Sequence, residues 1–463
     1  MDADHDDVYD VLIVGGGVVG LSILWSATLF GWKCALVEAE SDLLYWASGS
    51  NSGIVCTGVD ASPGTLERAL IRDSISRIRP HCQTHNIPMR PGGSLVCRWP
   101  WDEEEQGNDK HSLQDVLMES HEAGDEHART LSAQEVQILE PSLSKQCLGA
   151  VHIPGEIVVD PWLFSIAYAV ESRENGATIF VKWKFNPEQS SFDGNVWTAV
   201  RENDADEQNC SSQCQSIKAK AIVNCTGLFS DDIQAKVHGN NKTEIYPSWI
   251  AKPRRGQYRI FQGNSKTTIT RPIQPIPTQR TKGIFVFGTI YNQICVGPTA
   301  LDQESKSDRS VDAVVSKELS MLAKKVVPAL DTTSSYVGDY VGLRPGTDKR
   351  DYQIYSSASM RWVAAAGIRS TGLTASLGIG RHVTHLLTSL LPQPEAPVRV
   401  KTSQLPPLAL LIRQYHERGD GCVRLQDGNI YKVTHPITKL GWDAITDFGT
   451  IEQSTALSAR SRL

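Results

Sequence analysis

The uncharged stretch at residues 11–32 joins a strand-like pattern to a helix-like one. Its first residues, 11–14, are all apolar, which is typical of a parallel strand that is covered on both faces. Each of the three consecutive glycines that follow would weaken a helix by about 1 kcal/mol relative to alanine, so one membrane-spanning helix is disfavoured. The pattern instead predicts a strand, a glycine turn over 15–20 and a helix from about 18 to 30.

The glycines of this turn match the spacing Gly-x-Gly-x-x-Gly between a strand and a helix. A second apolar strand, 33–37, follows the helix and ends at Glu38, eighteen residues after the last glycine. A dinucleotide-binding unit carries at this place the carboxylate that binds the ribose, while the glycines admit the pyrophosphate and the helix N-terminus faces its charge. The predicted cofactor contacts in this unit are Gly15, Gly17, Val18, Val19, Gly20 and Glu38.

Two further strands run into glycine turns much later in the chain. Alternating apolar positions predict strands at 177–185 and 219–227, and the latter ends in Asn-Cys-Thr-Gly. A third strand starts at Arg361 and enters a long helix through a turn at 367–372. The separation of these turns indicates one nucleotide-binding domain that is assembled from discontinuous pieces.

Length, charge and cysteine content limit the number of domains and the kinds of partner that the chain can have. A chain of 463 residues is too long for one ordinary core, so we expect two domains. A net charge of -6 gives no reason to expect nucleic acid as a partner.

The flank at 1–7 is acidic and has no lysine or arginine, so it does not predict a secretory signal. The ten scattered cysteines are therefore interpreted as reduced intracellular thiols. The Cys210–Cys214 pair lies in a polar stretch that favours a hairpin loop over a zinc site, and 101–111 is predicted to be a solvated acidic loop.

Five more motifs occur in an order that one family shares. They are SGSNSGIVCTGVD at 48–60, RRGQY at 254–258, VGPTALD at 296–302, GLRP at 342–345 and GIRSTGLT at 367–374. With the N-terminal unit, they make the chain over about residues 8–390 resemble the D-amino-acid oxidase superfamily of FAD-dependent oxidoreductases. Within it, the motifs are most similar to the branch of glycerol-3-phosphate oxidases and L-2-hydroxyglutarate dehydrogenases. Residues 391–463 are not covered by this resemblance.

The resemblance implies FAD as the cofactor and an α/β fold of two domains. One would be a discontinuous, Rossmann-like FAD-binding domain, a parallel sheet with helices. The other would be an α+β substrate domain with a mostly antiparallel sheet. The expected boundaries are 1–80, 155–235 and 335–395 for the FAD-binding domain, 81–154 and 236–334 for the substrate domain, and 396–463 for a C-terminal extension.

The resemblance also implies the roles of individual residues. Arg344 and Ser370 would hold the anionic end of the substrate, a task that suits the two parallel hydrogen bonds of a guanidinium group. A salt bridge between the domains is the alternative interpretation of Arg344. The other residues that the resemblance places beside the cofactor are Ser48, Asn51, Ser52, Gly53, Gly227, Gly367, Gly372, Leu373 and Thr374.

Cys56 departs from the family pattern. Alcohol-oxidising members that are similar to this chain carry a histidine base there, whereas a thiol stays neutral up to a pH of about 8.5 unless a neighbour lowers its pKa. Three interpretations follow: a thiolate base activated by a neighbour such as Arg369, a spacer beside another base, or a mark of altered activity. The candidate replacement bases are His152, Tyr258 and Lys252.

We therefore expect an FAD-dependent oxidase that moves a hydride from glycerol 3-phosphate or a small 2-hydroxy acid to the flavin, with oxygen as the acceptor. An amine or amino-acid oxidase is one alternative, because an amine substrate does not need the missing base. A non-catalytic FAD-binding assembly factor is another, although such a protein would have no use for Arg344 and Ser370 as an anion clamp. No metal site is predicted.

The last three residues provide a separate signal. Ser461, Arg462 and Leu463 differ by one conservative change from the Ser-Lys-Leu peroxisomal address. The sequence thus predicts delivery to peroxisomes by the import receptor that reads this address. That location suits an oxidase that releases hydrogen peroxide.

Overall fold

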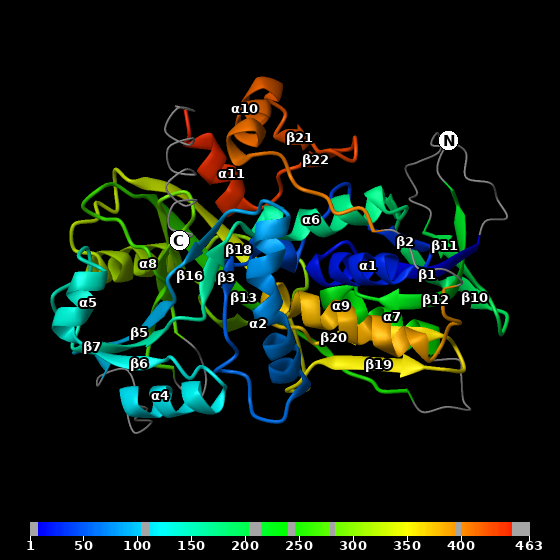
Figure 1. The fold of residues 1–463 in the computed structure, drawn as a ribbon, viewed down its shortest axis with the longest axis horizontal. Helices are drawn as coiled ribbons and strands as arrows, with labels where there is room; N and C mark the ends of the chain where they lie inside the picture. Colours follow the sequence, from blue (N-terminus) through cyan, green and yellow to red (C-terminus); the bar gives the residue numbers. More distant parts are fainter. Residues whose placement is uncertain are drawn as a thin grey trace.

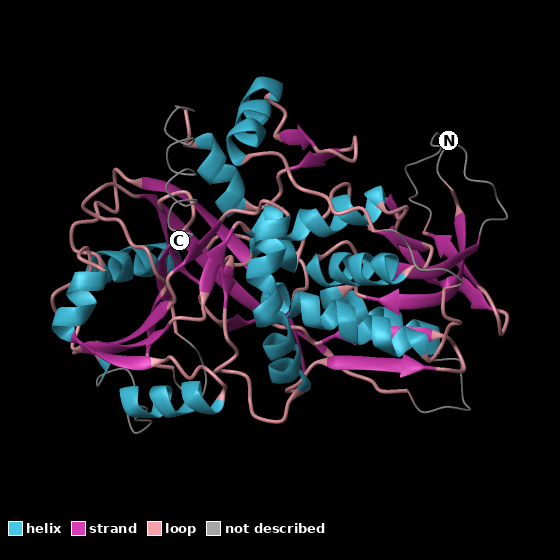
Figure 2. Ribbon diagram, in the orientation of Figure 1, coloured by secondary structure: helices cyan, strands magenta, loops and turns pink. Residues whose placement is uncertain are grey.

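The computed structural model describes residues 8–102, 112–202, 214–238, 246–277, 283–394 and 400–446. Two layered halves lie side by side, and a C-terminal segment lies over the place where they meet (Figures 1 and 2). Most of the acidic loop, Cys210 and the terminal Ser461–Leu463 lie outside the described residues, so the predictions that concern them stay predictions of the sequence.

An eight-stranded sheet forms the cofactor half of the molecule. At its centre β1 (Val8–Val14) lies parallel to β2 (Cys34–Val37) on one side and to β12 (Ser216–Asn224) on the other. The sheet also contains β9 (Thr178–Phe180), β10 (Phe185–Phe192), β11 (Trp197–Arg201), β19 (Gln353–Ser357) and β20 (Trp362–Ala366). Because β1, β12 and β20 are parallel neighbours, their carboxyl ends and the glycine turns that follow meet at one edge.

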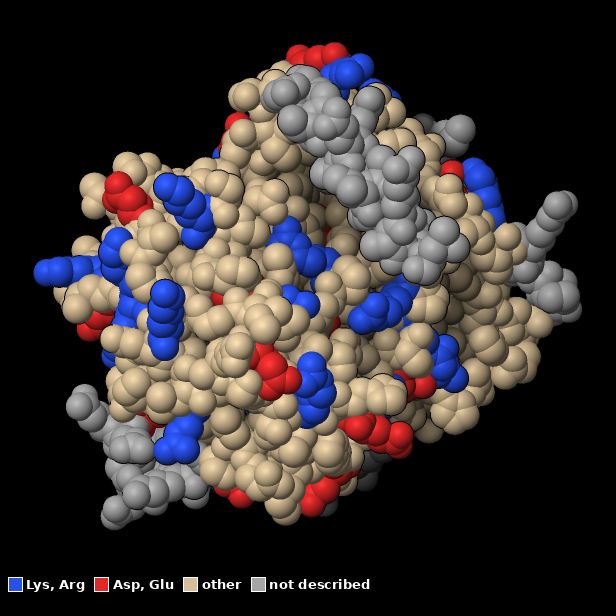
Figure 3. Space-filling model, turned by 60° about the vertical axis from the view of Figure 1, so that its left-hand side comes forward, with Lys and Arg blue, Asp and Glu red and all other residues tan. Residues whose placement is uncertain are grey.

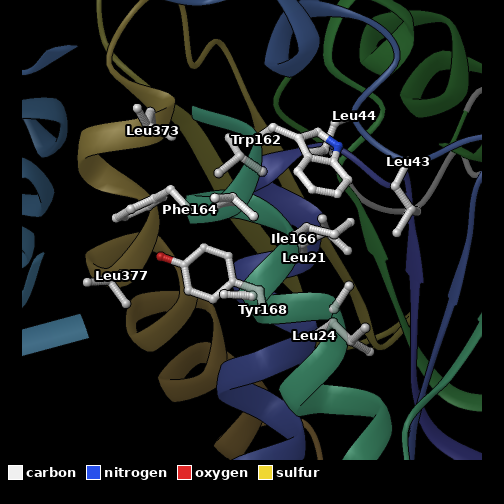
Figure 4. Close-up of a cluster of buried hydrophobic side chains, with 14 of the residues drawn as sticks. Leu21, Leu24, Leu43, Leu44, Trp162, Phe164, Ile166, Tyr168, Leu373 and Leu377 are labelled. Carbon is white, nitrogen blue, oxygen red and sulfur yellow. The ribbon is translucent and has the colours of Figure 1, made fainter. Parts of the chain in front are cut away.

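Helices cover both faces of this sheet. On one face α1 (Val18–Phe30), α6 (Pro161–Glu174) and α9 (Gly372–Thr388) interdigitate their apolar side chains, as Figure 4 shows for Leu21, Tyr168 and Leu377. The helix α2 (Leu66–Thr84) packs on α9, where a side chain at Gly378 would meet the Leu70 carbonyl oxygen at 2.4 Å. The opposite face is covered by α7 (Ser230–His238).

The other half is a nine-stranded, mostly antiparallel sheet. Helices α8 (Ala313–Val326) and α5 (Ala133–Leu139) bury apolar side chains against it, and α4 (Leu113–Glu122) lies beside β5, β6 and β7. Its strands are β5 (Ser94–Arg98), β6 (Arg129–Ser132), β7 (Gly149–Ile153), β13 (Ala251–Gln262), β14 (Ile273–Pro275), β15 (Phe285–Gly288), β16 (Gln293–Gly297), β17 (Leu301–Asp302) and β18 (Tyr336–Thr347). A small sheet of β3 (Ile54–Val55), β8 (Ile157–Val159) and β4 (Met89–Pro91) lies between the halves, and two short 3-10 turns occupy Ala47–Ser50 and Gly227–Phe229.

The predicted α/β fold with one parallel-containing and one mostly antiparallel sheet is confirmed, with two local differences. Strand β18 lies in the stretch 335–395 that the sequence predicted for the cofactor domain, but it pairs with β13 in the large antiparallel sheet. The predicted strand at 177–185 is two strands, because the chain turns at Lys182, which has a φ of 54°. No helix in the described part of the chain is both long enough and apolar enough to cross a membrane.

The C-terminal segment 400–446 contacts both halves (Figure 1). It consists of α10 (Leu408–Arg418), a hairpin of β21 (Cys422–Arg424) and β22 (Ile430–Lys432), and α11 (Pro436–Asp443). The Trp442 indole donates a hydrogen bond to Tyr291 of the substrate half, at 2.8 Å. Both Tyr291 and Thr438 donate to the buried carboxylate of Asp160, which caps α6 of the cofactor half.

We expect Thr438→Val to destabilise the protein by about 1–3 kcal/mol, because it removes one donor from the buried Asp160 carboxylate while it keeps the side-chain shape. Denaturant titration of the FAD-loaded protein measures this loss. Thr130→Val, on an exposed position of β6, is the matched control and should change stability by less than about 0.5 kcal/mol. Equal stability of both variants would contradict a role for this hydrogen bond in holding α11.

Candidate active site

A cavity of about 1520 Å³ lies where the glycine turns of the cofactor half face the large antiparallel sheet. Three of the predicted residues are buried and do not line the cavity: Gly20, Gly53 and Thr374. The predicted residues that line it are Gly15, Gly17, Val18, Val19, Glu38, Ser48, Asn51, Ser52, Cys56, Gly227, Tyr258, Arg344, Gly367, Ser370, Gly372 and Leu373.

The first glycine turn is too crowded for larger residues. Gly15 has a φ of 112°, and a side chain at Gly20 would meet the Gly15 carbonyl oxygen at 1.9 Å. Gly17 lines the cavity, and a Cβ there would lie 3.0 Å from the Ser48 hydroxyl oxygen. That hydroxyl accepts a hydrogen bond from the Val18 N–H at 2.9 Å, so the 48–56 segment is fixed to the first turn of α1.

Glu38 lies at the end of β2, where the dinucleotide motif requires an acid. Its carboxylate accepts the Gly16 N–H at 2.6 Å and the Glu40 N–H at 2.9 Å, and the residue lines the cavity. Burial raises the pKa of Glu38 above its ordinary value, while these two backbone donors oppose that rise. The side chain is therefore held in one orientation, with its remaining lone pairs available for ribose hydroxyls.

Arg344 lies on β18 in the cavity wall, directly across from Arg254 of β13. Its guanidinium donates to the Thr299 carbonyl oxygen at 2.8 Å and lies beside the Tyr258 hydroxyl. Burial lowers the pKa of Arg344, but a guanidinium stays charged in proteins. Within the described part of the chain no carboxylate lies within ion-pair distance of Arg344, so the interdomain salt bridge considered as an alternative is not observed.

Tyr258 supports the arginine and is unsuited to act as a base. Its ring stacks on Tyr340, with centroids 4.5 Å apart, and burial raises the pKa of its hydroxyl far above the ordinary value. A phenol that stays neutral near pH 7 is a hydrogen-bond donor and acceptor, not a proton acceptor. Among the other replacement bases, Lys252 lines the cavity, whereas His152 lies outside its lining on β7 and contacts the Gly92 carbonyl oxygen at 2.9 Å.

Cys56 follows strand β3 and lines the cavity. Its N–H donates to the Thr374 hydroxyl at 3.2 Å, and its sulfur lies 3.7 Å from the same oxygen. The suggested activator, Arg369, is engaged by the Glu67 carboxylate at 3.4 Å and by the Arg350 carbonyl oxygen. These contacts hold the guanidinium group at the start of α2.

Sequence reasoning missed several residues at the cavity, because only tertiary pairing brings them there. Gln303 and Glu304 line the cavity, and the segment 303–312 of the substrate half, which carries them, crosses to the cofactor half. Its Lys306 pairs with Asp231 at 2.8 Å, and its Arg309 donates to the Tyr45 carbonyl oxygen at 2.9 Å and lies over the Trp46 ring. Glu67, Glu156 and Gln274 also line the cavity. No local motif in the sequence marks any of these residues.

The surface outside the cavity shows no concentration of one charge on the face seen in Figure 3. Among the described residues of that face, lysine and arginine side chains are interspersed with acidic and uncharged ones. No group of three or more histidine, cysteine, aspartate or glutamate side chains in the described ranges is placed to hold a metal ion.

The model of one protein family, FAD dependent oxidoreductase, matches residues 10–386 of the chain. The chain belongs to this family. The match contains all of the glycine turns, the 48–56 segment and Arg344, and it ends before the C-terminal segment.

Relatives among the FAD-dependent oxidoreductases support the similarity to glycerol-3-phosphate oxidases and L-2-hydroxyglutarate dehydrogenases that the motifs indicated. Glycerol 3-phosphate dehydrogenase of Caloramator mitchellensis is 27% identical over 384 residues, which cover 83% of this chain and 74% of the relative. Glycerol 3-phosphate oxidase of Mycoplasma pneumoniae is 27% identical over 390 residues, which cover 82% of this chain and 94% of the relative. Mitochondrial L-2-hydroxyglutarate dehydrogenase of Nematostella vectensis is 24% identical over 303 residues, which cover 63% of this chain and 62% of the relative.

A solved structure of L-alpha-glycerophosphate oxidase from Mycoplasma pneumoniae with FAD bound has the same fold. Its TM-score is 0.73 at 24% identity, and the match covers 86% of this chain and 99% of that one. The protein is thus an FAD-dependent oxidoreductase related to glycerol-3-phosphate oxidases and dehydrogenases. The donors and glycines described above fit FAD: Glu38 for the ribose, and the Gly15–Gly17 turn at the α1 N-terminus for the pyrophosphate.

Proposed function

We propose that this protein is an FAD-dependent oxidase of glycerol 3-phosphate or a small 2-hydroxy acid, with oxygen as the electron acceptor. One observation carries the proposal: the charged guanidinium of Arg344 faces the cavity that the glycine turns and the 48–56 segment also line. A cation without a carboxylate partner in the described structure suits a substrate with an anionic group.

The residues around the cavity have different roles in substrate binding, positioning and proton transfer. Arg344 would bind the phosphate or carboxylate and so place the hydroxyl-bearing carbon, with Ser370 as a further donor. Tyr258, stacked on Tyr340, restricts the movement of Arg344. FAD would supply the two-electron acceptor for a hydride. The chain's own residues must then accept the hydroxyl proton, and Cys56 stands where similar alcohol-oxidising members of the family carry a histidine for this task.

Oxygen as the acceptor is favoured by a glycerol 3-phosphate oxidase that this chain matches over nearly its whole length. The glycerol 3-phosphate oxidase of Mycoplasma pneumoniae is covered over 94% of its length, compared with 74% for the glycerol 3-phosphate dehydrogenase. An oxidase returns electrons to oxygen and releases hydrogen peroxide. A dehydrogenase requires a different acceptor.

Anaerobic reduction of the flavin tests the proposal. The purified FAD-loaded protein is mixed with glycerol 3-phosphate, L-2-hydroxyglutarate or a panel of amino acids while the flavin absorbance band is followed. We expect bleaching by one of the two hydroxy compounds, and rapid return of the yellow colour with peroxide release when air is admitted. Slow return in air would identify a dehydrogenase.

An amine or amino-acid oxidase is the second candidate, and Cys56 is the observation that favours it. A neutral amine carries a lone pair that assists loss of the hydride, so no base is needed at that position. Bleaching by an amino acid alone would establish this candidate. Failure of every compound to bleach a fully loaded protein would support the third alternative, a non-catalytic FAD-binding assembly factor.

Cys56→His tests the departure from the family directly. Because Cys56 lines the cavity, we expect the histidine to raise the rate of flavin reduction by the hydroxy substrate at neutral pH by about tenfold or more. Stopped-flow measurement of flavin bleaching gives this rate. Cys56→Ala is the control, and an equal rate for all three proteins would mean that position 56 serves as a spacer.

A further inference from the structure

The segment 303–312 of the substrate half forms part of the wall of the cofactor cavity. Its first two residues line the cavity, each of its residues is described, and none of them belongs to a helix or a strand. Both of its ends are held by β13 of the substrate half. The Gln303 N–H donates to the Pro253 carbonyl oxygen at 3.1 Å, and the Asp312 N–H donates to the Gln257 side-chain oxygen at 2.9 Å. The residues between these ends reach across to the cofactor half, and we call this segment the 303–312 strap.

Lys306 makes the first contact of the strap with the cofactor half. Its ammonium group pairs with Asp231 at 2.8 Å and with Asp232 at 2.7 Å, at the start of α7. The lysine side chain is 24% exposed, so the two pairs are partly shielded from solvent. Both carboxylates come soon after the Gly227–Phe229 turn, which lines the cavity. This pairing therefore fixes the strap to one border of the cofactor cavity.

Arg309 makes the second contact. Its guanidinium group donates to the Tyr45 carbonyl oxygen at 2.9 Å and lies over the rings of Tyr45 and Trp46, 4.6 Å and 4.8 Å from their centroids. The faces of aromatic rings attract such a cation. The Trp46 indole in turn donates to Glu40 at 3.0 Å, two residues after the predicted ribose acid Glu38. Since Tyr45, Trp46 and Glu38 all line the cavity, Arg309 fixes the strap beside the ribose end of the cofactor site.

The strap can leave the cofactor half without exposing a buried apolar side chain. Residues 303–310 have the sequence QESKSDRS, and the Val311 side chain that follows is already 47% exposed. Among the described contacts, those that join the strap to the cofactor half are made by Lys306 and Arg309. Segments with few buried apolar contacts open at a low free-energy cost. Glu304 is exposed to solvent and also lines the cavity, so the strap is a thin boundary between the cavity and water.

We propose that the 303–312 strap is the gate through which FAD enters and leaves, and that Lys306 and Arg309 set the rate of FAD release by holding this gate closed. The inference rests on FAD as the cofactor of the family and is independent of the substrate proposed above. Release would require both contacts to break together. The gate thus couples cofactor retention to the position of the substrate half, which carries the strap.

Exchange of bound FAD tests this role. The FAD-loaded protein is mixed with a large excess of isotopically labelled FAD, and the label bound to the protein is measured after rapid desalting. We expect Lys306→Met to raise the exchange rate by about threefold and Arg309→Met by about tenfold, because each removes one attachment of the strap. If the two attachments act independently, the double variant should exchange about 30-fold faster than wild type.

Three control variants separate the gate from general effects of the substitutions. Lys317→Met removes an exposed lysine of α8 and should leave the exchange rate within about twofold of wild type. Arg309→Lys keeps the charge but loses the planar group that stacks on the rings, so its rate should lie between wild type and Arg309→Met. Lys306→Asp combined with Asp232→Lys should restore part of the slow exchange that Lys306→Asp alone loses. Unfolding midpoints of the FAD-free proteins report whether the variants are folded.

Salt dependence and hydrogen exchange identify the strap as the part that opens. Raising the NaCl concentration from about 0.05 to about 0.5 M should accelerate FAD exchange more in wild type than in the double variant, because salt screens the Lys306 ion pairs. Backbone amides of residues 303–312 should exchange hydrogen faster in the FAD-loaded double variant than in FAD-loaded wild type. Equal FAD exchange in wild type and the double variant, including none in either, would overturn the inference, as would faster FAD exchange with unchanged hydrogen exchange in the strap.

Discussion

Replacement of Arg344 by methionine should raise the KM for the anionic substrate by about 30- to 5,000-fold, which corresponds to about 2–5 kcal/mol for truncating one partner of a buried charge pair. The guanidinium is anchored by the Thr299 carbonyl oxygen and by Tyr258, so its position is fixed before substrate binds. Methionine keeps much of the length of the side chain but offers no donor. Steady-state kinetics over a wide range of substrate concentration measures the effect.

Arg254→Met is the matched control for this prediction. Arg254 lies opposite Arg344 in the β13–β18 pair and also borders the cavity, but its side chain is 39% exposed and pairs with Asp302 at 3.7 Å. Its removal should change KM by about tenfold at most, because solvent screens an exposed charge. A change of less than about threefold for Arg344→Met would exclude a direct contact between this guanidinium and the substrate.

Gly17→Val should yield a protein that does not retain FAD. A side chain at this position is directed at the Ser48 hydroxyl, 3.0 Å from the first added carbon, and it occupies the surface along which the backbone meets the pyrophosphate. The ratio of flavin to protein absorbance after purification, followed by titration with FAD, measures the loss.

Gly17→Ala is the graded control, because the backbone of Gly17 has a φ of -77° that any residue adopts. It should fold normally and bind FAD more weakly than wild type but more tightly than the valine variant. A yellow, fully loaded Gly17→Val protein would contradict the placement of the pyrophosphate at this turn.

The local parts of the fold could be predicted from the sequence. The helix α1 spans Val18–Phe30, as the pattern of glycines and apolar residues predicted, and Glu38 occupies the end of β2. These features follow from turn geometry and from hydrophobic periodicity within a few residues. The sequence placed residues 335–395 in the cofactor domain, whereas β18 within this range pairs with β13 in the large antiparallel sheet. The sequence of β18 gives no information about this partner, which lies about eighty residues earlier.

The candidate site could be predicted only where a linear motif marks it. The turns, the 48–56 segment, Arg344 and Tyr258 all belong to such motifs, and the structure brings them to one cavity. Glu156 reaches the cavity only through the pairing of β3 with β8, and Gln303 and Glu304 only because a substrate-half segment crosses to the cofactor half. Long-range register of this kind is set by the packing of the whole chain, which periodicity and spacing do not reveal.

The segment 400–446 completes the core of the cofactor half, although it lies beyond the family match. The family match ends at residue 386, yet Trp442, Ile412 and Tyr431 beyond it are buried in the same core as α1 and α6. An expression fragment cut at the family boundary would leave a broad apolar surface in water, and such surfaces promote aggregation. The smallest unit worth producing as a soluble enzyme therefore extends through α11, well beyond the region that homology alone would select.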